Sequence, residues 1–230
     1  MSRIALLELL PEGLRDSPLL DEALTHRSAG QRNNERLEYL GDAVLGLVVA
    51  EHLFREHPEA SEGDLSRLRA TLVNKDSLAV IGKAQGLGGH ISLGQGEMKS
   101  GGARRNSILA DAVEAVIGAV YLSSGFEAAR AFVLVLYAER LSNLPCLDEL
   151  KDPKTRLQEW LQGRNRDLPV YEVTAIAGKP HEQHFRALCR IGDEPQPFHG
   201  EGTSRRRAEQ AAAEEAMTAL VTRGKGQEAS

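Results

Sequence analysis

The chain has 230 residues, with 28 Lys or Arg against 33 Asp or Glu, so its formal net charge is -5. This length suits one good-sized domain followed by a small module, and the acidic balance argues against a nucleic-acid binder that is basic throughout. Aromatic residues make up only 4% of the chain, while Leu, Ala and Val are abundant, which favours helices over a β-sandwich or a barrel.

Charge is unevenly distributed along the chain. Residues 1–150 hold 15 Lys or Arg against 21 Asp or Glu, a net charge of -6, whereas residues 151–230 hold 13 against 12, a net charge of +1. The acidity therefore belongs to the first part, and any basic surface must be local.

The cysteines and the N-terminal residues indicate in which cellular compartment the protein works. Cys146 and Cys189 lie in a predicted linker and a predicted strand, without CxxC or Cys/His ligand spacing, which argues against zinc and against a disulfide framework. The N-terminal stretch has neither the apolar core nor the cleavage site of a signal peptide, and no run approaches about 18 apolar residues. We expect a cytoplasmic protein without a membrane association.

Short helices are predicted over residues 5–30, broken at Pro11 and Pro18, and the stretch ALTHRSAG ends them. His26 in that stretch could be catalytic, but no Ser or Cys nucleophile pairs with it in the sequence. We interpret it as a hydrogen-bonded structural histidine.

A long helix is predicted from about Asn34 to His57, and it carries a stripe of carboxylates. Glu35, Glu38 and Asp42 are spaced i, i+3 and i+7, within about 60° of one helix face, and apolar residues take the remaining circumference. Two like charges 4 Å apart repel by about 4 kcal/mol at an effective dielectric near 20. A divalent cation would relieve this repulsion, and hard oxygen ligands indicate Mg2+ or Mn2+ rather than zinc.

The next segment is predicted to be one helix from Asp64, its cap, to about Gln85, and a Gly-rich connection follows over residues 91–107. This connection lacks the GxxxxGK[ST] spacing of a nucleotide-binding P-loop. Its cations Lys99, Arg104 and Arg105 either meet an anionic substrate or form a solvated basic loop.

A second acidic pair occurs in the strongly helical pattern that starts at Ser107. Asp111 and Glu114 are spaced i, i+3 inside an otherwise apolar run, and a further helix is predicted from Phe126 to Leu141. Neither acidic helix contains Glu-x-x-His, which disfavours a di-iron carboxylate bundle.

The helical period is lost at Pro145, where we place the domain boundary. The expected division is a first domain over 1–145, a linker over 146–151, a second domain over 152–222 and a flexible tail over 223–230. In the second domain, Asp152 caps a helix that begins with Pro153, and period-2 alternation then predicts three antiparallel strands. The last helix opens with Arg205, Arg206 and Arg207, whose charges oppose the helix dipole, so we expect them to meet an external polyanion.

These segments resemble bacterial ribonuclease III in sequence and in order. The resemblance lies in NERLEYLGDAVL, EGDLSRLRATLVN, GEMKSGGARRNSILADAVEA and the C-terminal module with SRRRAEQAAAEEA, and it covers the chain apart from its C-terminal end. It implies an all-α endonuclease domain followed by an α-β-β-β-α double-stranded-RNA-binding domain. It also implies a homodimer that uses Mg2+, or Mn2+ in its place, and no organic cofactor. The implied reaction cuts double-stranded RNA to 5′-phosphate and 3′-hydroxyl ends in ribosomal RNA and mRNA processing.

The resemblance also implies the residues of the site. The family's metal-binding acids fall on Glu38, Asp42, Asp111 and Glu114, with Glu35 and Glu62 as further acids of the catalytic valley. The RNA contacts fall on Thr155, Gln158, Glu159, Pro180, His181, Ser204, Arg205, Arg206 and Arg207. The less favoured alternative for Glu62 is a surface turn residue. Without the resemblance, the three positions of the first helix would be read as an ordinary polar face.

Two other functions are compatible with parts of this pattern. One is an RNA-binding protein whose first domain only dimerises, although such a protein has little need for a complete set of acids. The other is a metal-dependent phosphohydrolase of small substrates, which the C-terminal RNA-binding module disfavours.

Overall fold

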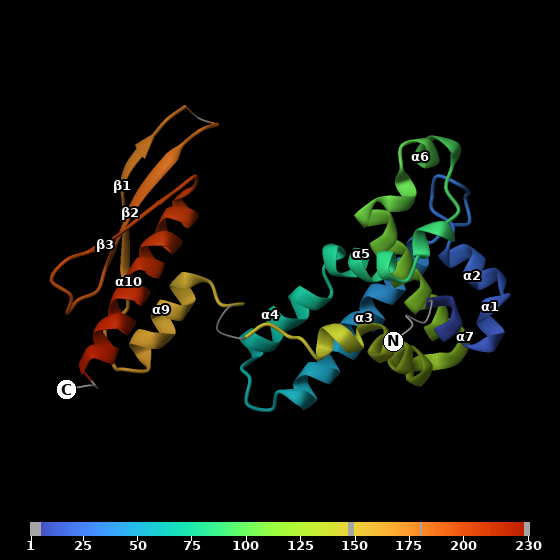
Figure 1. The fold of residues 1–230 in the computed structure, drawn as a ribbon, viewed down its shortest axis with the longest axis horizontal. Helices are drawn as coiled ribbons and strands as arrows, with labels where there is room; N and C mark the ends of the chain where they lie inside the picture. The colour runs from blue at the N-terminus through green and yellow to red at the C-terminus, as the bar shows by residue number, and fades with distance from the viewer. Residues whose placement is uncertain (1–5, 147–149, 180, 228–230) are drawn as a thin grey trace. The chain divides into compact units, whose positions relative to one another are not determined.

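A computed structural model describes residues 6–146, 150–179 and 181–227, which form two compact units dividing between Pro145 and Cys146. The first unit is helical, and the second combines helices with a three-stranded antiparallel sheet (Figure 1). This confirms the fold class predicted from the sequence.

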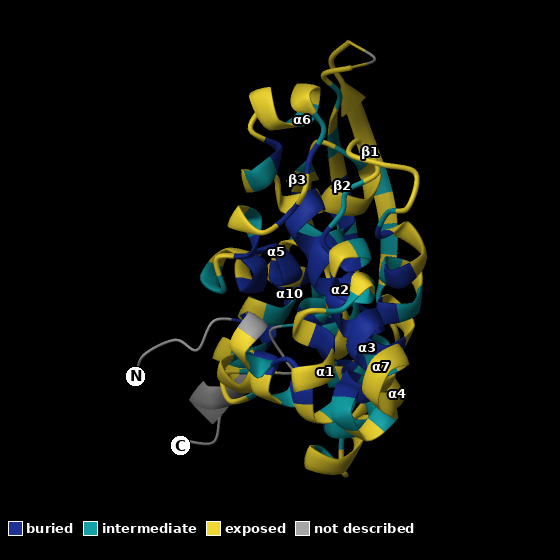
Figure 2. Ribbon diagram, turned by 90° about the vertical axis from the view of Figure 1, so that its right-hand side faces the viewer, coloured by how far each residue is buried: buried dark blue, intermediate teal, exposed yellow. Residues whose placement is uncertain are grey.

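The first unit is built around two long helices, α3 and α7, which make its most extensive contact. Nearly every side chain from Ile108 to Val120 of α7 is buried (Figure 2). α7 is long and apolar enough to cross a membrane by length and composition alone, but 67% of its apolar stretch is buried, as expected of a core helix. The elements are η1 (Leu6–Leu9), α1 (Glu12–Arg15), α2 (Pro18–Ala23), α3 (Glu35–Glu56), α4 (Glu62–Leu72), α5 (Lys75–Ala84), η2 (Leu87–Gly89), α6 (Gln95–Lys99), η3 (Gly102–Arg104) and α7 (Asn106–Leu141).

Two glycines let α3 and α7 approach each other backbone to backbone. A Cβ atom added to Gly41 would lie 1.7 Å from the carbonyl oxygen of Glu114, and one added to Gly118 would lie 2.3 Å from that of Leu37. Any side chain at either position would force the helices apart. The crossing therefore sets Glu38 and Asp42 of α3 at the level of Glu114 on α7.

The predicted helix from Asp64 to about Gln85 is wrong in two respects. It is two helices, because Asn74 interrupts it and its side-chain oxygen accepts a hydrogen bond from Ser77 N at 2.8 Å, capping α5. An Asn side chain competes in this way with continuation of the helix. The cap of α4 is Ser61, whose Oγ accepts from Asp64 N at 3.2 Å and donates to Asp64 Oδ2 at 2.7 Å.

Glycines occur at two irregular segments of the first unit. The Gly-rich stretch predicted as a connection contains the short α6 and η3. The predicted separation of the two helices before and after residue 125 is present as a kink in α7, where Gly125 has φ 80°. Only glycine adopts this conformation readily.

In the second unit, two helices cover one face of the sheet. The elements are α9 (Pro153–Gln162), β1 (Val170–Ala177), β2 (His184–Arg190), β3 (Phe198–Gly202) and α10 (Arg205–Gln227), with strand order β1-β2-β3. Leu157 and Leu161 of α9 pack with Cys189 of β2 and the alanine face of α10 in the core. α10 continues to Gln227, beyond residue 222 where we expected the domain to end and a flexible tail to begin.

Candidate active site and RNA-binding surface

Three carboxylates from two distant segments meet beside the crossing of α3 and α7. Oxygen atoms of Glu38, Asp111 and Glu114 all lie within 4.8 Å of one another. Glu38 projects from α3, and the other two acids lie one turn apart on α7. Within the described residues this group contains neither His nor Cys, so its donors are all carboxylate oxygens.

Glu114 is the most buried acid of the site, with only 6% of its surface exposed. Burial raises its pKa to about 8, helped by the negative charges of Asp42, Glu38 and Asp111, while Lys75 acts in the opposite direction. Burial and the charge of Asp111 also raise the pKa of Glu38. The site therefore holds more negative charge than its surroundings neutralise, which favours a bound cation.

The other predicted acids occupy less central positions. Asp42 is exposed and lies outside the group of three, yet it is the carboxylate whose charge raises the pKa of Glu114 most. Glu35 is exposed and pairs with Arg27 at 3.6 Å. Glu62 is the exposed first residue of α4, where it accepts a hydrogen bond from Ser66 Oγ at 2.8 Å. In the described part of the chain, Glu62 does not belong to the cluster around Glu114.

Lys75 is a residue of this site that the sequence analysis did not identify. Its Nζ lies 3.0 Å from Asp111 Oδ1, and its charge lowers the pKa of both Glu38 and Glu114. It lines a hollow of about 580 Å³ together with Glu38 and Asp111. One signal was available, because Lys75 is the first residue of a helix, where a cation opposes the dipole.

The donor set suits a hard divalent cation. Carboxylate oxygens are the ligands of Mg2+ and Mn2+, whereas zinc sites usually include His or Cys. The mutual repulsion that raises the pKa of Glu114 is also the interaction that such a cation relieves. Glu38, Asp111 and Glu114 therefore fit a metal of this class, with Asp42 close enough to act on the same site.

The raised pKa of Glu114 predicts an unusual pH dependence of stability. Between about 4.5 and about 8 the folded protein holds a proton that the unfolded chain has lost. In a chelator, this group should therefore make the free energy of unfolding fall as pH rises through that window, by at most about 1.4 kcal/mol per pH unit. Urea unfolding of the wild type and of Glu114→Gln across the pH series measures the difference. Identical slopes in the two proteins would contradict the assignment.

The predicted RNA-contact residues of α9 and the following hairpin differ in accessibility. Gln158 and Glu159 are exposed on α9, whereas Thr155 is half-buried and donates its hydroxyl hydrogen to Asp152 Oδ2 at 2.8 Å. Glu159 also pairs with Lys151 at 2.7 Å. His181 is exposed in the turn between β1 and β2. Pro180 lies outside the described residues.

The arginines at the start of α10 fall into two kinds. Ser204 Oγ accepts from Arg207 N at 3.2 Å, which caps the helix. Arg205 Nε donates to Glu209 Oε1 at 2.8 Å. Arg206 and Arg207 are exposed, and no acid of the described residues forms an ion pair with either. Two of the three cations are thus available to an external anion.

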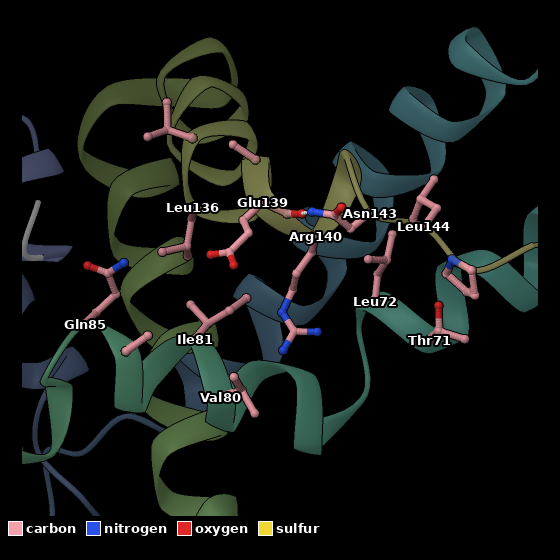
Figure 3. A pocket seen from close by; sticks show the side chains of 14 residues that line it. Thr71, Leu72, Val80, Ile81, Gln85, Leu136, Glu139, Arg140, Asn143 and Leu144 are labelled. Carbon is pink, nitrogen blue, oxygen red and sulfur yellow. Dashed lines mark hydrogen bonds between the residues drawn. The ribbon is translucent and has the colours of Figure 1, made fainter. Parts of the chain in front are cut away.

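A larger cavity of the first unit lies away from the acids. It is a half-open groove of about 700 Å³ between α5 and the end of α7, lined by apolar side chains such as Val80, Ile81 and Leu136 (Figure 3). Glu139 is the one acid among its lining residues. This groove lacks the clustered oxygen donors that distinguish the site at Glu114.

Each of the two units matches a known protein family. A family model described as ribonuclease-III-like matches residues 16–141, more than half of the chain. The chain belongs to the ribonuclease III family. A second family model, the double-stranded RNA binding motif, matches residues 153–220. The resemblance stated from the sequence motifs is thereby confirmed, and the chain is a ribonuclease with a C-terminal motif for double-stranded RNA.

Whole-chain relatives support the same assignment. The chain is 56% identical over 207 residues to ribonuclease 3 of Vibrio vulnificus, covering 90% of this chain and 92% of the relative. It is 55% identical over 216 residues to ribonuclease 3 of Alkalilimnicola ehrlichii, covering 94% and 95%.

A solved nuclease domain of ribonuclease III from Campylobacter jejuni is similar to part of this chain. The two share 46% sequence identity with a TM-score of 0.56, over 60% of this chain and 99% of that domain. That study describes flexibility in a region of the Campylobacter protein involved in dimer formation. A second structure of the same domain has 45% identity and a TM-score of 0.55, over 63% of this chain.

Proposed function

We propose that this ribonuclease III family member hydrolyses double-stranded RNA with Mg2+, or Mn2+ in its place, held by Glu38, Asp42, Asp111 and Glu114. Its products carry 5′-phosphate and 3′-hydroxyl ends, and its role is in ribosomal RNA and mRNA processing in the cytoplasm. The observation that carries the proposal is the meeting of Glu38, Asp111 and Glu114 within 4.8 Å. The second unit supports duplex RNA as the substrate, because its sequence matches the double-stranded RNA binding motif.

The chain's own residues supply the framework for hydrolysis. When bound, the cation supplies positive charge for the reacting phosphate group and makes water a stronger nucleophile. Glu38, Asp111 and Glu114 hold that charge in place, and the burial of Glu114 restricts its side chain. Lys75 orients the Asp111 carboxylate through their 3.0 Å contact. No Ser, Cys or His nucleophile is required in this scheme.

The main alternative is a protein that binds duplex RNA without cutting it. Against it stands the electrostatic cost of the acids, which raises the pKa of buried Glu114 to about 8. A domain that only dimerised would be more stable with uncharged side chains at these positions. The acids are therefore better explained by catalysis.

A cleavage assay tests the proposal directly. The substrates are labelled duplex RNA, single-stranded RNA and duplex DNA of one sequence, each with Mg2+ and with chelator. We expect cutting of the RNA duplex alone, only with Mg2+, and new 5′-phosphate ends on the products. Binding of the duplex without cutting in Mg2+ would favour the non-catalytic alternative. Hydrolysis of free nucleotides by the same preparation would favour the small-substrate phosphohydrolase.

An exposed apolar stripe supports the proposed homodimer. Tyr39, Leu47 and Phe54 of α3 are 83%, 56% and 70% exposed, and their spacing places them within about 80° of one helix face. Leu122 of α7 is also exposed, and it lines a hollow of about 580 Å³ together with Tyr39. Contiguous exposed apolar surface marks a protein interface, and a two-fold dimer would cover the same stripe on both copies.

Charges on this stripe should dissociate the dimer. We expect the Leu47→Glu, Phe54→Glu double variant to be a monomer by light scattering at a concentration where the wild type is a dimer, because two buried unpaired carboxylates disfavour association. Val80→Glu is the control, since Val80 is 53% exposed but lines the separate groove of Figure 3. A double variant that remained dimeric would show that the interface lies elsewhere.

A further inference from the structure

The second unit contains a buried carboxylate that the proposed function does not use. Glu209 on α10 is only 8% exposed. Its Oε2 accepts a hydrogen bond from Lys154 Nζ at 2.7 Å, and its Oε1 accepts one from Arg205 Nε at 2.8 Å. Burial raises the pKa of Glu209, but the two cations outweigh this effect and hold the pKa below its ordinary value. Glu209 is therefore ionised at neutral pH and bonded through both oxygens.

The bond with Lys154 joins the beginnings of the two helices of this unit, whereas the bond with Arg205 lies within α10. Lys154 lies in the first turn of α9, and Arg205 is the first residue of α10. The Lys154 ammonium also lies 4.0 Å from the centre of the Tyr171 ring on β1. Glu209 of α10 thus bonds to Lys154 of α9, and Lys154 in turn contacts the sheet at Tyr171.

Stability alone does not account for this arrangement. Replacing a buried ion pair with apolar residues of similar size is often neutral or stabilising, because removal from water offsets the attraction between the charges. A carboxylate that accepts a charged hydrogen bond through each oxygen instead fixes the relative positions of its two partners.

We propose that Glu209 is a positioning residue for duplex RNA, which sets the spacing between the N-termini of α9 and α10. The inference rests on the proposed function and on the RNA contacts that the family resemblance implies near these two ends, among them Thr155, Gln158, Arg206 and Arg207. A-form duplexes present the minor groove and the phosphates across the major groove at a fixed separation, so two contact elements must keep a matching separation. In this proposal Arg205 holds the Glu209 carboxylate in position, while the exposed Arg206 and Arg207 contact phosphates.

Charge and positioning predict opposite results for Glu209→Gln. If only net charge mattered, removal of an acid beside an RNA-binding surface would strengthen binding, because one repulsion is lost. If Glu209 positions the two helix ends, its removal weakens binding although the protein becomes more positive. The sign of the change therefore separates the two explanations.

The test measures the dissociation constant of the full chain for labelled duplex RNA in chelator, across a salt series. We expect Glu209→Gln to raise the Kd roughly tenfold and to reduce the salt slope by about one, as for the loss of one phosphate contact. Cleavage in Mg2+ should show a raised KM with kcat unchanged at saturating duplex. The control is Glu201→Gln, an exposed acid on β3 whose ion pair with Arg186 of β2 lies within the sheet, and it should bind unchanged or more tightly. A Kd for Glu209→Gln equal to or below that of the wild type would overturn the proposal.

Further variants separate positioning from folding and from the proposed function. Lys154→Met combined with Glu209→Gln leaves no buried charge unpaired, so it should melt like the wild type and still bind weakly; wild-type binding would overturn the positioning role. Arg206→Ala with Arg207→Ala should also weaken binding. If it does and Glu209→Gln does not, only the positioning role is wrong. If neither weakens binding, the proposed RNA surface is wrong and the inference is overturned with it.

Discussion

Replacement of Glu114 by Gln should abolish cleavage of duplex RNA while leaving duplex binding intact. Glu114 is the buried member of the acid cluster, and Gln keeps its size but removes the negative charge that a cation needs. We expect kcat to fall by about four to six orders of magnitude, the range seen when an essential member of a catalytic unit is removed. Binding should persist because the RNA-binding motif lies in the other unit.

Two measurements on this variant distinguish a lost metal site from a damaged fold. Titration with Mn2+ should show weaker binding in Glu114→Gln, and thermal unfolding in chelator should show no loss of stability, since the neutral side chain removes a buried repulsion. Glu139→Gln, an exposed acid on the same helix, is the matched control and should cut normally. Wild-type cleavage by Glu114→Gln would refute the catalytic assignment.

Introducing a methyl group at Gly41 should strongly destabilise the first unit. The added Cβ would lie 1.7 Å from the carbonyl oxygen of Glu114 and 2.5 Å from its carbonyl carbon, so α3 and α7 must separate. Backbone cannot yield as a flexible side chain can, and we expect Gly41→Ala to lower the free energy of unfolding by about 3 kcal/mol. Separation of the helices would also move Glu38 away from Glu114 and weaken metal binding.

Gly46 on the same helix is the matched control for this prediction. A Cβ added there meets nothing within 4 Å, so Gly46→Ala should be neutral or stabilising by up to about 1 kcal/mol through helix propensity. Urea unfolding gives the stability of each variant, and Mn2+ titration reports the acid cluster. A Gly41→Ala protein as stable as Gly46→Ala would mean that the helices do not cross this closely.

Several features of this protein follow from its sequence alone, because they depend on residues close together in the chain. Helical spacing placed Glu38 and Asp42 on one face and paired Asp111 with Glu114. Asp152 and Pro153 predicted the start of α9, and alternation predicted the three strands. Such patterns are local, since hydrogen bonds and side-chain periodicity within one element generate them.

Tertiary structure decided which of these distant groups meet. The contact between Lys75 and Asp111 joins residues 36 positions apart, and no local pattern encodes it. The close crossing at Gly41 depends equally on its partner helix, whereas in sequence Gly41 and Gly46 are both simply glycines inside one helix. The burial of Glu209 likewise depends on the fold, which brings Lys154 of α9 beside it. The physical reason is that burial and long-range electrostatics arise only when separate elements pack together.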